Sequence, residues 1–248
     1  MKITKRICTV AVMVALSGCA STSGGNSAND PFEGYNRAAY SFNETLDKVA
    51  LKPAATAYEA ILPQFVQTAI GNFFGNIGDL YSAVNQLLQG KINEGVSTIM
   101  RVSLNTTFGL GGVLDISSEA GLTKHKSDFG VTLGVWGVGA GPYVVLPLLG
   151  PTTLRDTVAL PADIYGDVWS YKYPVNGRNI GYGVRLIDRR AQLLDATTLL
   201  EDAALDKYVF VRDAYLQSRQ ARIDGGRDYR PMDKSPATTD DPGLSPGK

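Results

Sequence analysis

The sequence predicts a mainly α-helical fold that is interrupted by one Gly/Pro-rich irregular or hairpin segment. Apolar residues recur at helical spacing over most of the region from position 30 to position 222. Two long runs carry no formal charge, and glycines and prolines are concentrated in the second. The chain has 248 residues, of which 44% are apolar, and this suffices for one large domain or two small ones with a core.

The N-terminus has the layout of a secretory signal peptide, which we place at residues 1–18. A basic stretch at positions 2–6 precedes the apolar run 7–16, which is too short to span a bilayer. The run ends in Leu16-Ser17-Gly18-Cys19, which resembles the lipobox of bacterial lipoproteins. In such proteins the peptidase cuts before the cysteine, so we expect Cys19 to be the lipidation site. An ordinary signal peptide with an incidental cysteine is the alternative.

The charge balance and the cysteines narrow the function classes. The precursor has 24 basic and 24 acidic residues, and removal of the signal peptide leaves 21 basic residues against the same 24 acidic ones. Because nucleic acid binding needs a basic surface, no nucleic acid partner is expected. Cys8 is lost with the signal peptide and Cys19 is predicted to carry lipid, which excludes a disulfide framework and a cysteine metal site.

Flexible segments are predicted on both sides of the folded body. Residues 19–29 form a lipidated tether of small, uncharged residues, which reaches roughly 15–20 Å and holds the body against the membrane surface. Ala20 stands where an aspartate would resemble an inner-membrane retention signal, and this favours the outer membrane. Residues 225–248 are rich in Pro, Ser, Thr, Asp and Gly and are predicted to be a disordered tail. The folded domain is therefore placed at residues 30–224.

The body opens with a strong helix-start signal. Asp30 is predicted to cap the helix, Pro31 to occupy its first position and Glu33 to complete a capping box. Lys52-Pro53 predicts the start of a short Ala-rich helix that ends at Pro63. The residues between these signals form one apolar stripe at helical spacing, which consists of Phe32, Tyr35, Ala39, Phe42, Leu46 and Val49.

Two amphipathic helices are predicted next, over residues 64–88 and 92–108, and each ends in glycine. Residues 60–78 carry no formal charge, but Pro63, several amides and three glycines interrupt the apolar face and argue against a membrane span. This stretch is interpreted as an amphipathic helix. It either packs in the core or lies in the lipid interface.

The second uncharged run, 129–154, must bend because its prolines exclude one continuous transmembrane helix. We expect a helix over 128–136, a Gly-rich turn and an extended segment over 143–146. The run lies either in an ordinary core or near a bilayer. Residues 178–194 and 206–222 are predicted to be amphipathic helices that cover the body and turn their charged faces to solvent.

No residue set for catalysis, metal binding or cofactor binding is recognisable. His125 is the only histidine, which argues against a histidine metal site or triad. Nucleophile-elbow, zinc-helix and phosphate-loop motifs are missing. The glycine run 137–141 lacks the helix of a dinucleotide-binding loop and is followed by Pro142. Asp163 and Asp167 share a helix face, but two solvated carboxylates are the preferred interpretation. We therefore expect neither enzymatic activity nor a cofactor.

Several motifs spread in order over residues 30–222 resemble the MlaA (VacJ) family of outer-membrane lipoproteins, and the lipobox agrees with this independently. The motifs are Asp30-Pro31-Phe32-Glu33-Gly34-Tyr35-Asn36-Arg37, Tyr40-Ser41-Phe42-Asn43, Arg101-Val102-Ser103-Leu104-Asn105, Phe108-Gly109-Leu110-Gly111-Gly112, Gly139-Ala140-Gly141-Pro142-Tyr143-Val144-Val145-Leu146-Pro147, Thr153-Leu154-Arg155-Asp156, Arg190-Ala191-Gln192-Leu193-Leu194-Asp195 and Val211-Arg212-Asp213-Ala214-Tyr215.

The resemblance implies a ring-like bundle of amphipathic and interfacial helices in the inner leaflet of the outer membrane of a Gram-negative bacterium, bound to trimeric porins. It implies that the protein takes phospholipids misplaced in the outer leaflet and passes them through a central amphipathic channel to a soluble periplasmic lipid-binding carrier. Lipid asymmetry of the membrane would thereby be maintained. The expected location is the periplasmic face of the outer membrane, with a lipid anchor at Cys19.

The resemblance also suggests a set of lipid channel or hairpin residues, namely Phe42, Asn43, Gly139, Gly141, Pro142, Tyr143 and Pro147. The first two match an early-helix motif that influences the channel in this family, and the others belong to the segment that shapes the channel wall or a movable hairpin. Core packing is the alternative role for each. A scaffold lipoprotein without transfer activity and a lipid hydrolase are the rival functions.

Overall fold

The computed structural model describes residues 30–225, and helices make up most of this region. The predicted signal peptide (1–18), the predicted tether (19–29), and the predicted tail beyond Gly225 lie outside the described residues. The strands of the described part form one two-stranded sheet. The prediction of a mainly α fold with a hairpin segment is confirmed.

The N-terminal arm consists of α2 (Glu33–Leu46), a π-helical turn η1 (Asp47–Leu51) and α3 (Lys52–Ile61). Pro53 lies in the first turn of α3, where a missing N–H is tolerated. The predicted start at Lys52-Pro53 is confirmed, although a π-helical turn rather than a break precedes it. Leu62 has extended backbone angles before Pro63, and this ends the arm as predicted.

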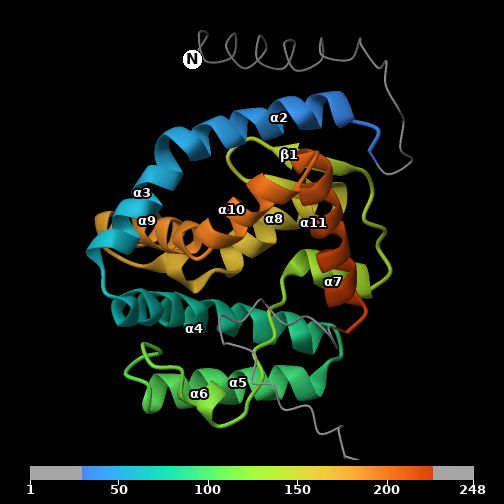
Figure 1. Cartoon of the computed structure of the whole chain (residues 1–248). Coiled ribbons are helices and arrows are strands. Elements are labelled where there is room, and N and C mark those ends of the chain that lie inside the picture. Colours follow the sequence, from blue (N-terminus) through green and yellow to red (C-terminus); the bar gives the residue numbers. More distant parts are fainter. Residues whose placement is uncertain (1–29, 226–248) are drawn as a thin grey trace, which may run out of the picture.

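Helices α4 (Gln64–Leu88) and α5 (Ile92–Thr107) pack against each other below the arm (Figure 1). Gly90 has a φ of 75°, a left-handed conformation that favours glycine, and this lets the chain reverse between them. A Cβ on Gly95 would lie 2.6 Å from Cδ2 of Leu87, so glycine permits the close approach. The short helix α6 (Ile116–Glu119) then packs on α5.

Helix α7 (Phe129–Val135) leads through a glycine-rich turn into the hairpin of β1 (Tyr143–Leu146) and β2 (Gly150–Thr153). The strands are antiparallel, with Tyr143 opposite Thr153 and Leu146 opposite Gly150. Thr153 also caps α8 (Leu154–Gly166) by accepting a hydrogen bond from the Asp156 amide. The predictions of a helix over 128–136 and an extended segment over 143–146 are confirmed. The partner strand β2 lies beyond the predicted extended segment.

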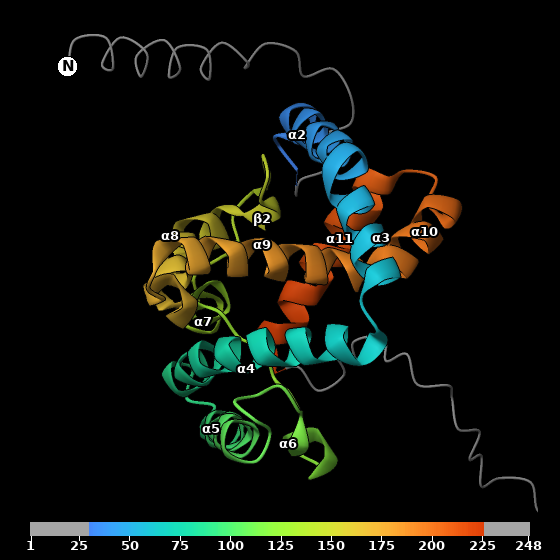
Figure 2. The ribbon, with the colours of Figure 1, turned by 90° about the vertical axis from the view of Figure 1, so that its left-hand side faces the viewer.

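The chain is completed by η2 (Val168–Tyr171), α9 (Val175–Ala191), α10 (Leu194–Ala203) and α11 (Lys207–Ile223). Helix α9 packs against α3 and α4, and α11 packs against α7 and β2. In the view of Figure 1, α2 at the top, α3 on the left, α4 below and α11 on the right form a ring around α8, α9 and α10, and α5 and α6 lie below α4. Figure 2 shows α9 crossing from α8 to α3 above α4.

In this ring, polar residues are buried and apolar residues are exposed more often than in an ordinary globular protein. Polar and charged side chains outnumber apolar ones among the fully buried residues of the described region. In α2 the buried residues are Asn36 and Ala39, whereas Phe32, Tyr35 and Phe42 of the predicted apolar stripe are about half exposed. The exposed large apolar residues of α4 and α5 are Phe65, Leu80, Val84, Leu87, Leu88, Ile92, Val96, Ile99 and Met100. Such an extensive exposed apolar surface marks contact with a protein or a membrane.

The prediction that α9 and α11 are covering helices with solvated polar faces is wrong. Asp188 of α9 is 3% exposed and Arg219 of α11 is 8% exposed, whereas Ile180 of α9 is 67% exposed. Polar groups can be buried when they hydrogen-bond or pair with one another, and both buried groups have such partners. The amphipathic pattern was therefore informative about the helices and misleading about which side faces inward.

Asp30 does not cap α2, contrary to the prediction. It is 1% exposed, accepts a hydrogen bond from Asn36 at 2.8 Å and another from the Tyr208 hydroxyl, and lies 3.4 Å from the guanidinium of Arg212. The cap position of α2 is Phe32, which has no side-chain hydrogen bond there. Several buried partners hold the carboxylate more firmly than one helix amide. Asp30 thus ties the beginning of the body to α11.

A small apolar core lies beside this carboxylate, between α2, β1 and α11. Its buried members are Ala39, Tyr143, Val145 and Tyr208. The Tyr208 ring packs edge-on against Tyr40, with 5.9 Å between ring centroids. The small aromatic core beside the hairpin is therefore also the place where the beginning of the described chain meets the start of α11.

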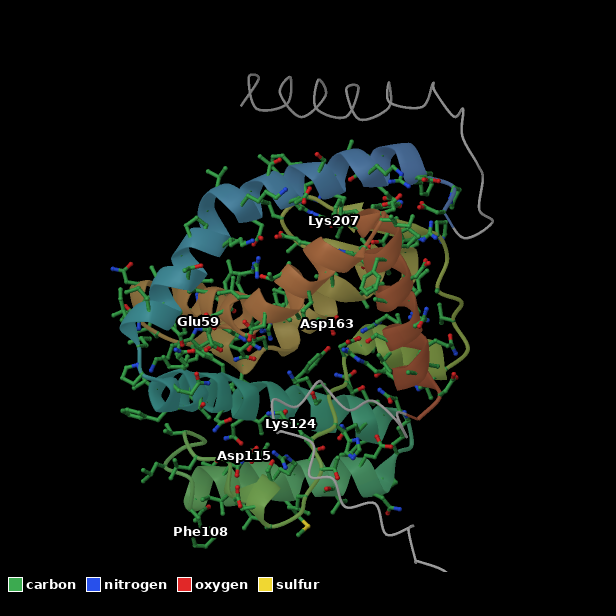
Figure 3. All side chains as sticks on the ribbon, viewed as in Figure 1. Glu59, Phe108, Asp115, Lys124, Asp163 and Lys207 are labelled. Atoms are coloured by element: carbon green, nitrogen blue, oxygen red, sulfur yellow. The ribbon has the colours of Figure 1, made fainter. Side chains whose placement is uncertain are left out.

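A second polar network fastens α6 to α5. Arg101, which is fully buried, donates to both carboxylate oxygens of Asp115 at 2.9 Å and to the carbonyl of Leu122. Asn105, one helical turn later, donates to the same carboxylate at 3.0 Å and accepts from the Ser117 amide. Figure 3 shows Asp115 between α4 and α5 in this view. The spacing of Arg101 and Asn105 therefore places both side chains on the loop that carries α6.

Removal of the Asp30 carboxylate should destabilise the fold because it leaves Asn36 and Arg212 without their buried acceptor. We expect Asp30→Ala to lower the free energy of unfolding by about 3 kcal/mol in urea titrations. The control Glu44→Ala removes a partly exposed partner of Lys48 and Lys207 and should cost less than about 1 kcal/mol. Equal losses for the two variants would contradict the assigned role of Asp30.

The Asp115 network makes a pH-dependent contribution to stability. Burial acts to raise the pKa of Asp115, but hydrogen bonds from Ser118 and Asn105 and the charge of Arg101 outweigh it and lower the pKa to about 2. Because the unfolded carboxyl takes up its proton first, this stabilisation, about 2 kcal/mol, is present at neutral pH and is lost as the pH falls from about 5 to about 2. The penalty of Asp115→Asn, measured by denaturant unfolding, should therefore shrink on acidification. A penalty that stays constant from pH 7 to pH 2.5 would rule this out.

Candidate functional site

A cavity of about 490 Å³ lies between α4, the segment before α7, the hairpin, α8, α9 and α11, and it is the candidate site. Its wall is both polar and apolar. The lining residues are Gly71, Phe74, Gly75, Gly78, Asp79, Tyr81, Ser82, Lys126, Ser127, Asp128, Leu146, Leu149, Gly150, Pro151, Thr152, Asp156, Leu160, Asp163, Asp167, Arg185, Asp188, Arg189, Gln192, Arg219 and Arg222.

The most connected group in the wall is the guanidinium of Arg219. It lies 2.5 and 2.8 Å from the two carboxylate oxygens of Asp128 and 2.9 Å from a carboxylate oxygen of Asp156. Asp156 also accepts hydrogen bonds from Tyr215 at 2.8 Å and from Arg155 at 3.0 Å. One cation of α11 thereby joins the start of α7 to the first turn of α8.

These pairs keep the carboxylates charged inside the protein. Burial acts to raise the pKa of Asp128, but the hydrogen bonds and charge of Arg219 lower it on balance. Burial likewise acts to raise the pKa of Asp156, but the charge and hydrogen bond of Arg219 outweigh it, so this pKa is also lowered. Gly130 lies so close that a Cβ there would be 2.4 Å from Asp156 Oδ1. Asp128, Asp156 and Arg219 therefore form an ionised network within the cavity wall at neutral pH, and it packs against backbone.

Asp163 and Asp167 lie in the cavity wall, so their interpretation as solvated carboxylates is wrong. Asp163 accepts a hydrogen bond from the Phe129 amide at 2.8 Å, and burial raises its pKa. Asp167 caps η2 through the Trp169 amide and lies 2.6 Å from Arg185. Figure 3 shows Asp163 near the centre of the ring. Each carboxylate is held by protein donors, and the described structure gives neither a nucleophilic partner.

Helix α4 faces the cavity with Gly71, Gly75 and Gly78, three or four residues apart. A Cβ on Gly71 would lie 2.9 Å from Nε2 of Gln192, and one on Gly78 would lie 3.6 Å from a guanidinium nitrogen of Arg185. The glycines therefore let the polar side chains of α9 approach the α4 backbone. These are the three glycines that argued against a membrane span, and they leave the inner face of α4 without side chains at these positions.

The hairpin supplies much of the apolar lining, through Leu146, Leu149 and Pro151. The turn residue Leu148 has a φ of 68°, unusual for a residue with a branched side chain, and is exposed together with Leu149. Water does not stabilise the exposed apolar side chains of Leu148 and Leu149 at the tip of the hairpin. The cavity thus has a charged side formed by helices and an apolar side formed by the hairpin and Leu160.

Two asparagines of α2 attach the hairpin to the arm. Asn36 donates to the carbonyl of Tyr143 at 3.0 Å and accepts from the amide of Val145 at 2.8 Å. Asn43, two turns later, donates to the carbonyl of Leu146 at 3.0 Å and accepts from the amide of Leu148 at 2.7 Å. The two side chains act as a substitute for a neighbouring strand along β1, because each satisfies one carbonyl and one amide.

The residues suggested by the family resemblance lie around the hairpin rather than in the cavity wall. Asn43 holds the turn, whereas Phe42 beside it is about half exposed. Tyr143 is buried in β1, and Pro147 lies exposed in the turn. Cys19 is outside the described residues. None of the suggested residues is among those that line the cavity.

The other three residues of that set precede the hairpin. Gly139 is exposed and has open space around it. Gly141 has a φ of 67°, and a Cβ there would lie 3.1 Å from the Cβ of Leu154. The carbonyl of Pro142 accepts a hydrogen bond from the amide of Leu154. These residues shape the approach to β1. The polar residues of α9 at 185, 188, 189 and 192 share one helix face, which was predicted to face solvent but lines the cavity.

Residues 30–225 contain no cluster of three or more His, Cys, Asp or Glu side chains placed to hold a metal ion. Within the same range, no helix combines the length and apolar character that crossing a bilayer requires.

Comparison with known proteins gives consistent matches. The family model described as MlaA lipoprotein matches residues 28–222. The intermembrane phospholipid transport system lipoprotein MlaA of Escherichia coli K12 is 38% identical over 85% of each chain. The protein of that name from Haemophilus influenzae is 33% identical over 86% of this chain and 88% of its own. A solved structure described as "Structural basis for maintenance of bacterial outer membrane lipid asymmetry" is 37% identical, with a TM-score of 0.69, and covers 78% of this chain and 98% of its own.

The asparagine contacts predict that the hairpin turn loosens without Asn43. In Asn43→Ala the amide of Leu148 loses its acceptor, so its hydrogen exchange should become at least about tenfold faster, as expected for one lost hydrogen bond. Phe42→Ala is the matched control, since Phe42 is the neighbouring residue and its half-exposed apolar side chain offers no hydrogen bond to the turn. Equal exchange at Leu148 in wild type and Asn43→Ala would show that the contact does not hold the turn.

Proposed function

The chain belongs to the MlaA lipoprotein family, and from this premise we propose that it removes mislocalised phospholipids from the outer leaflet of the outer membrane. The lipids pass through an amphipathic channel to a periplasmic lipid carrier, and membrane lipid asymmetry is maintained. The observation that carries this proposal is the cavity, whose wall combines an ionised network with apolar hairpin residues inside a ring that is apolar outside.

This arrangement matches what a phospholipid needs. A headgroup costs several kcal/mol or more to move into hydrocarbon without polar partners, so lipid flips slowly on its own. A path with polar groups on one side and apolar groups on the other offers partners to the headgroup and to the acyl chains together. Arg185 and Thr152 lie on such a wall with Leu146 and Leu160.

The outer surface of the protein is suited to lie in the membrane. Apolar side chains project from the outer faces of α2, α4 and α5, where water would be an unfavourable neighbour. We propose that this surface lies in the inner leaflet, with the body on the periplasmic side and the chain anchored through a lipidated Cys19. A trimeric porin and a soluble periplasmic lipid-binding carrier are the proposed protein partners.

The transfer is proposed to proceed without catalysis by this chain. The carboxylates of the cavity are engaged by arginines, amides and hydroxyls, and an acid or base in use needs a free edge toward substrate. The rival from another class is a scaffold lipoprotein that bridges a membrane protein and the periplasm without moving lipid.

Deletion of the gene should raise the phospholipid content of the outer leaflet and the sensitivity of the cells to detergent. Labelled-lipid transfer from vesicles that contain the protein and porin to the carrier should be substantial with wild type. It should fall severalfold with Gly78→Leu, whose side chain would enter the cavity. Gly183→Leu, at an exposed glycine of α9 with open space around it, should transfer like wild type, and both variants gain about 0.8 kcal/mol of helix propensity.

Each rival function predicts a different result. A scaffold would leave lipid transfer at the background rate in wild type, and a lipid hydrolase would release free fatty acid in the same assay. Intact asymmetry in the deletion strain would contradict the proposed function.

A further inference from the structure

Two cations of the cavity wall, Lys126 and Arg189, make no hydrogen bond or salt bridge with the described residues. Lys126 belongs to the segment before α7, and Arg189 belongs to the inner face of α9. Both side chains remain accessible to solvent although they line the cavity. They therefore differ from Arg185 and Arg219 in the same wall, which are paired with aspartates.

The carboxylates of the wall are already engaged elsewhere. Asp79 pairs with Lys124 at 3.1 Å, and Asp188 accepts hydrogen bonds from Tyr58 and Gln192, both at 2.9 Å. The remaining acids are held by Arg185, Arg219 and the Phe129 amide, as described above. The carboxylates of the cavity wall therefore have hydrogen-bond or ion-pair partners among the described residues, whereas Lys126 and Arg189 have none.

The unpaired cations also repel one another. Burial and then the positive charges of Lys124, Arg189 and Arg222 lower the pKa of Lys126. Burial and then the charge of Arg185 lower the pKa of Arg189, and Asp167 and Asp188 oppose this only in part. A bound anion would relieve this repulsion and accept hydrogen bonds from both side chains.

We propose that Lys126 and Arg189 bind the phosphate of a phospholipid headgroup at the cavity wall. The proposal rests on the proposed function and specifies where the lipid is held. A cavity of about 490 Å³ is in the size range of small-molecule sites, about 300–1,000 Å³, so it accepts a headgroup and its glycerol. Leu146, Leu149 and Leu160 line the same cavity and contact the first segments of the acyl chains.

The recognised chemistry is a phosphate ester or phosphate, which pairs strongly with lysine and arginine. It is tested with the full mature lipoprotein in detergent and three probes: dihexanoylphosphatidylglycerol, dihexanoylglycerol and inorganic phosphate. The variant Lys126→Gln/Arg189→Gln removes both cations. The control Lys48→Gln/Lys172→Gln removes the same charge from exposed positions outside the cavity.

The double cavity variant should bind dihexanoylphosphatidylglycerol at least about tenfold more weakly than wild type and the control, because charge-assisted hydrogen bonds are lost. Binding of dihexanoylglycerol, which has no phosphate, should be unchanged. Without ligand, the variant should unfold at the wild-type temperature or above it, since it removes repulsion and no protein contact. Unchanged phospholipid affinity, or an equal loss for dihexanoylglycerol, would overturn the proposal.

Two further comparisons distinguish a lipid phosphate from free phosphate, and the proposed binding site from the proposed function. Inorganic phosphate that binds as tightly as the lipid, and depends on the same cations, would overturn the headgroup assignment in favour of free phosphate. If wild type binds the lipid through these cations but transfers none to the carrier, the proposed function fails and the site stands. If wild type and variant bind and transfer alike, the site fails and the function stands.

Discussion

The ion pairs of Arg219 with Asp128 and Asp156 are the interaction on which the rest of the structure depends. They join α11 to α7 and α8 from inside the ring, at distances of 2.5 to 2.9 Å. A buried charge without partners is strongly unfavourable, so removal of any one member would leave the others exposed to a low dielectric. The ring can enclose a polar cavity because the carboxylates of its wall are paired or hydrogen-bonded, and the apolar residues are left to the outside.

An inverted distribution of polar and apolar residues explains several local features together. The glycines of α4 admit the polar side chains of α9, and Gly130 admits the Asp156 carboxylate. Asn36 and Asn43 replace a neighbouring strand for β1, so the hairpin needs no larger sheet. Asp30 performs the same task where the arm meets α11. Each of these contacts places polar side chains inside the protein, where an ordinary globular protein would have apolar packing.

The sequence predicts the elements better than their orientation. Pro53, Pro63, Gly90 and the periodic apolar residues locate α3, α4 and α5 because they act through local backbone chemistry. The inward side of α2 and α9 could not be predicted, because periodicity shows an apolar face without showing whether it contacts core or lipid. The family resemblance implied a channel, but the residues that line the cavity could not be predicted. The wall joins Asp128, Asp163, Arg185 and Arg219 from four separate segments, and a single sequence does not show which segments meet.

The most direct test of this account is the reactivity of single cysteines in outer-membrane vesicles. Ile99→Cys lies on the outer apolar surface, and Lys126→Cys lies in the cavity wall at an exposed position. If the apolar outside faces lipid and the polar inside faces water, a water-soluble maleimide should label the Lys126→Cys variant, while Ile99→Cys should react only with a lipid-soluble reagent. Rapid labelling of Ile99→Cys from water, with no reaction at Lys126→Cys, would contradict the inverted arrangement.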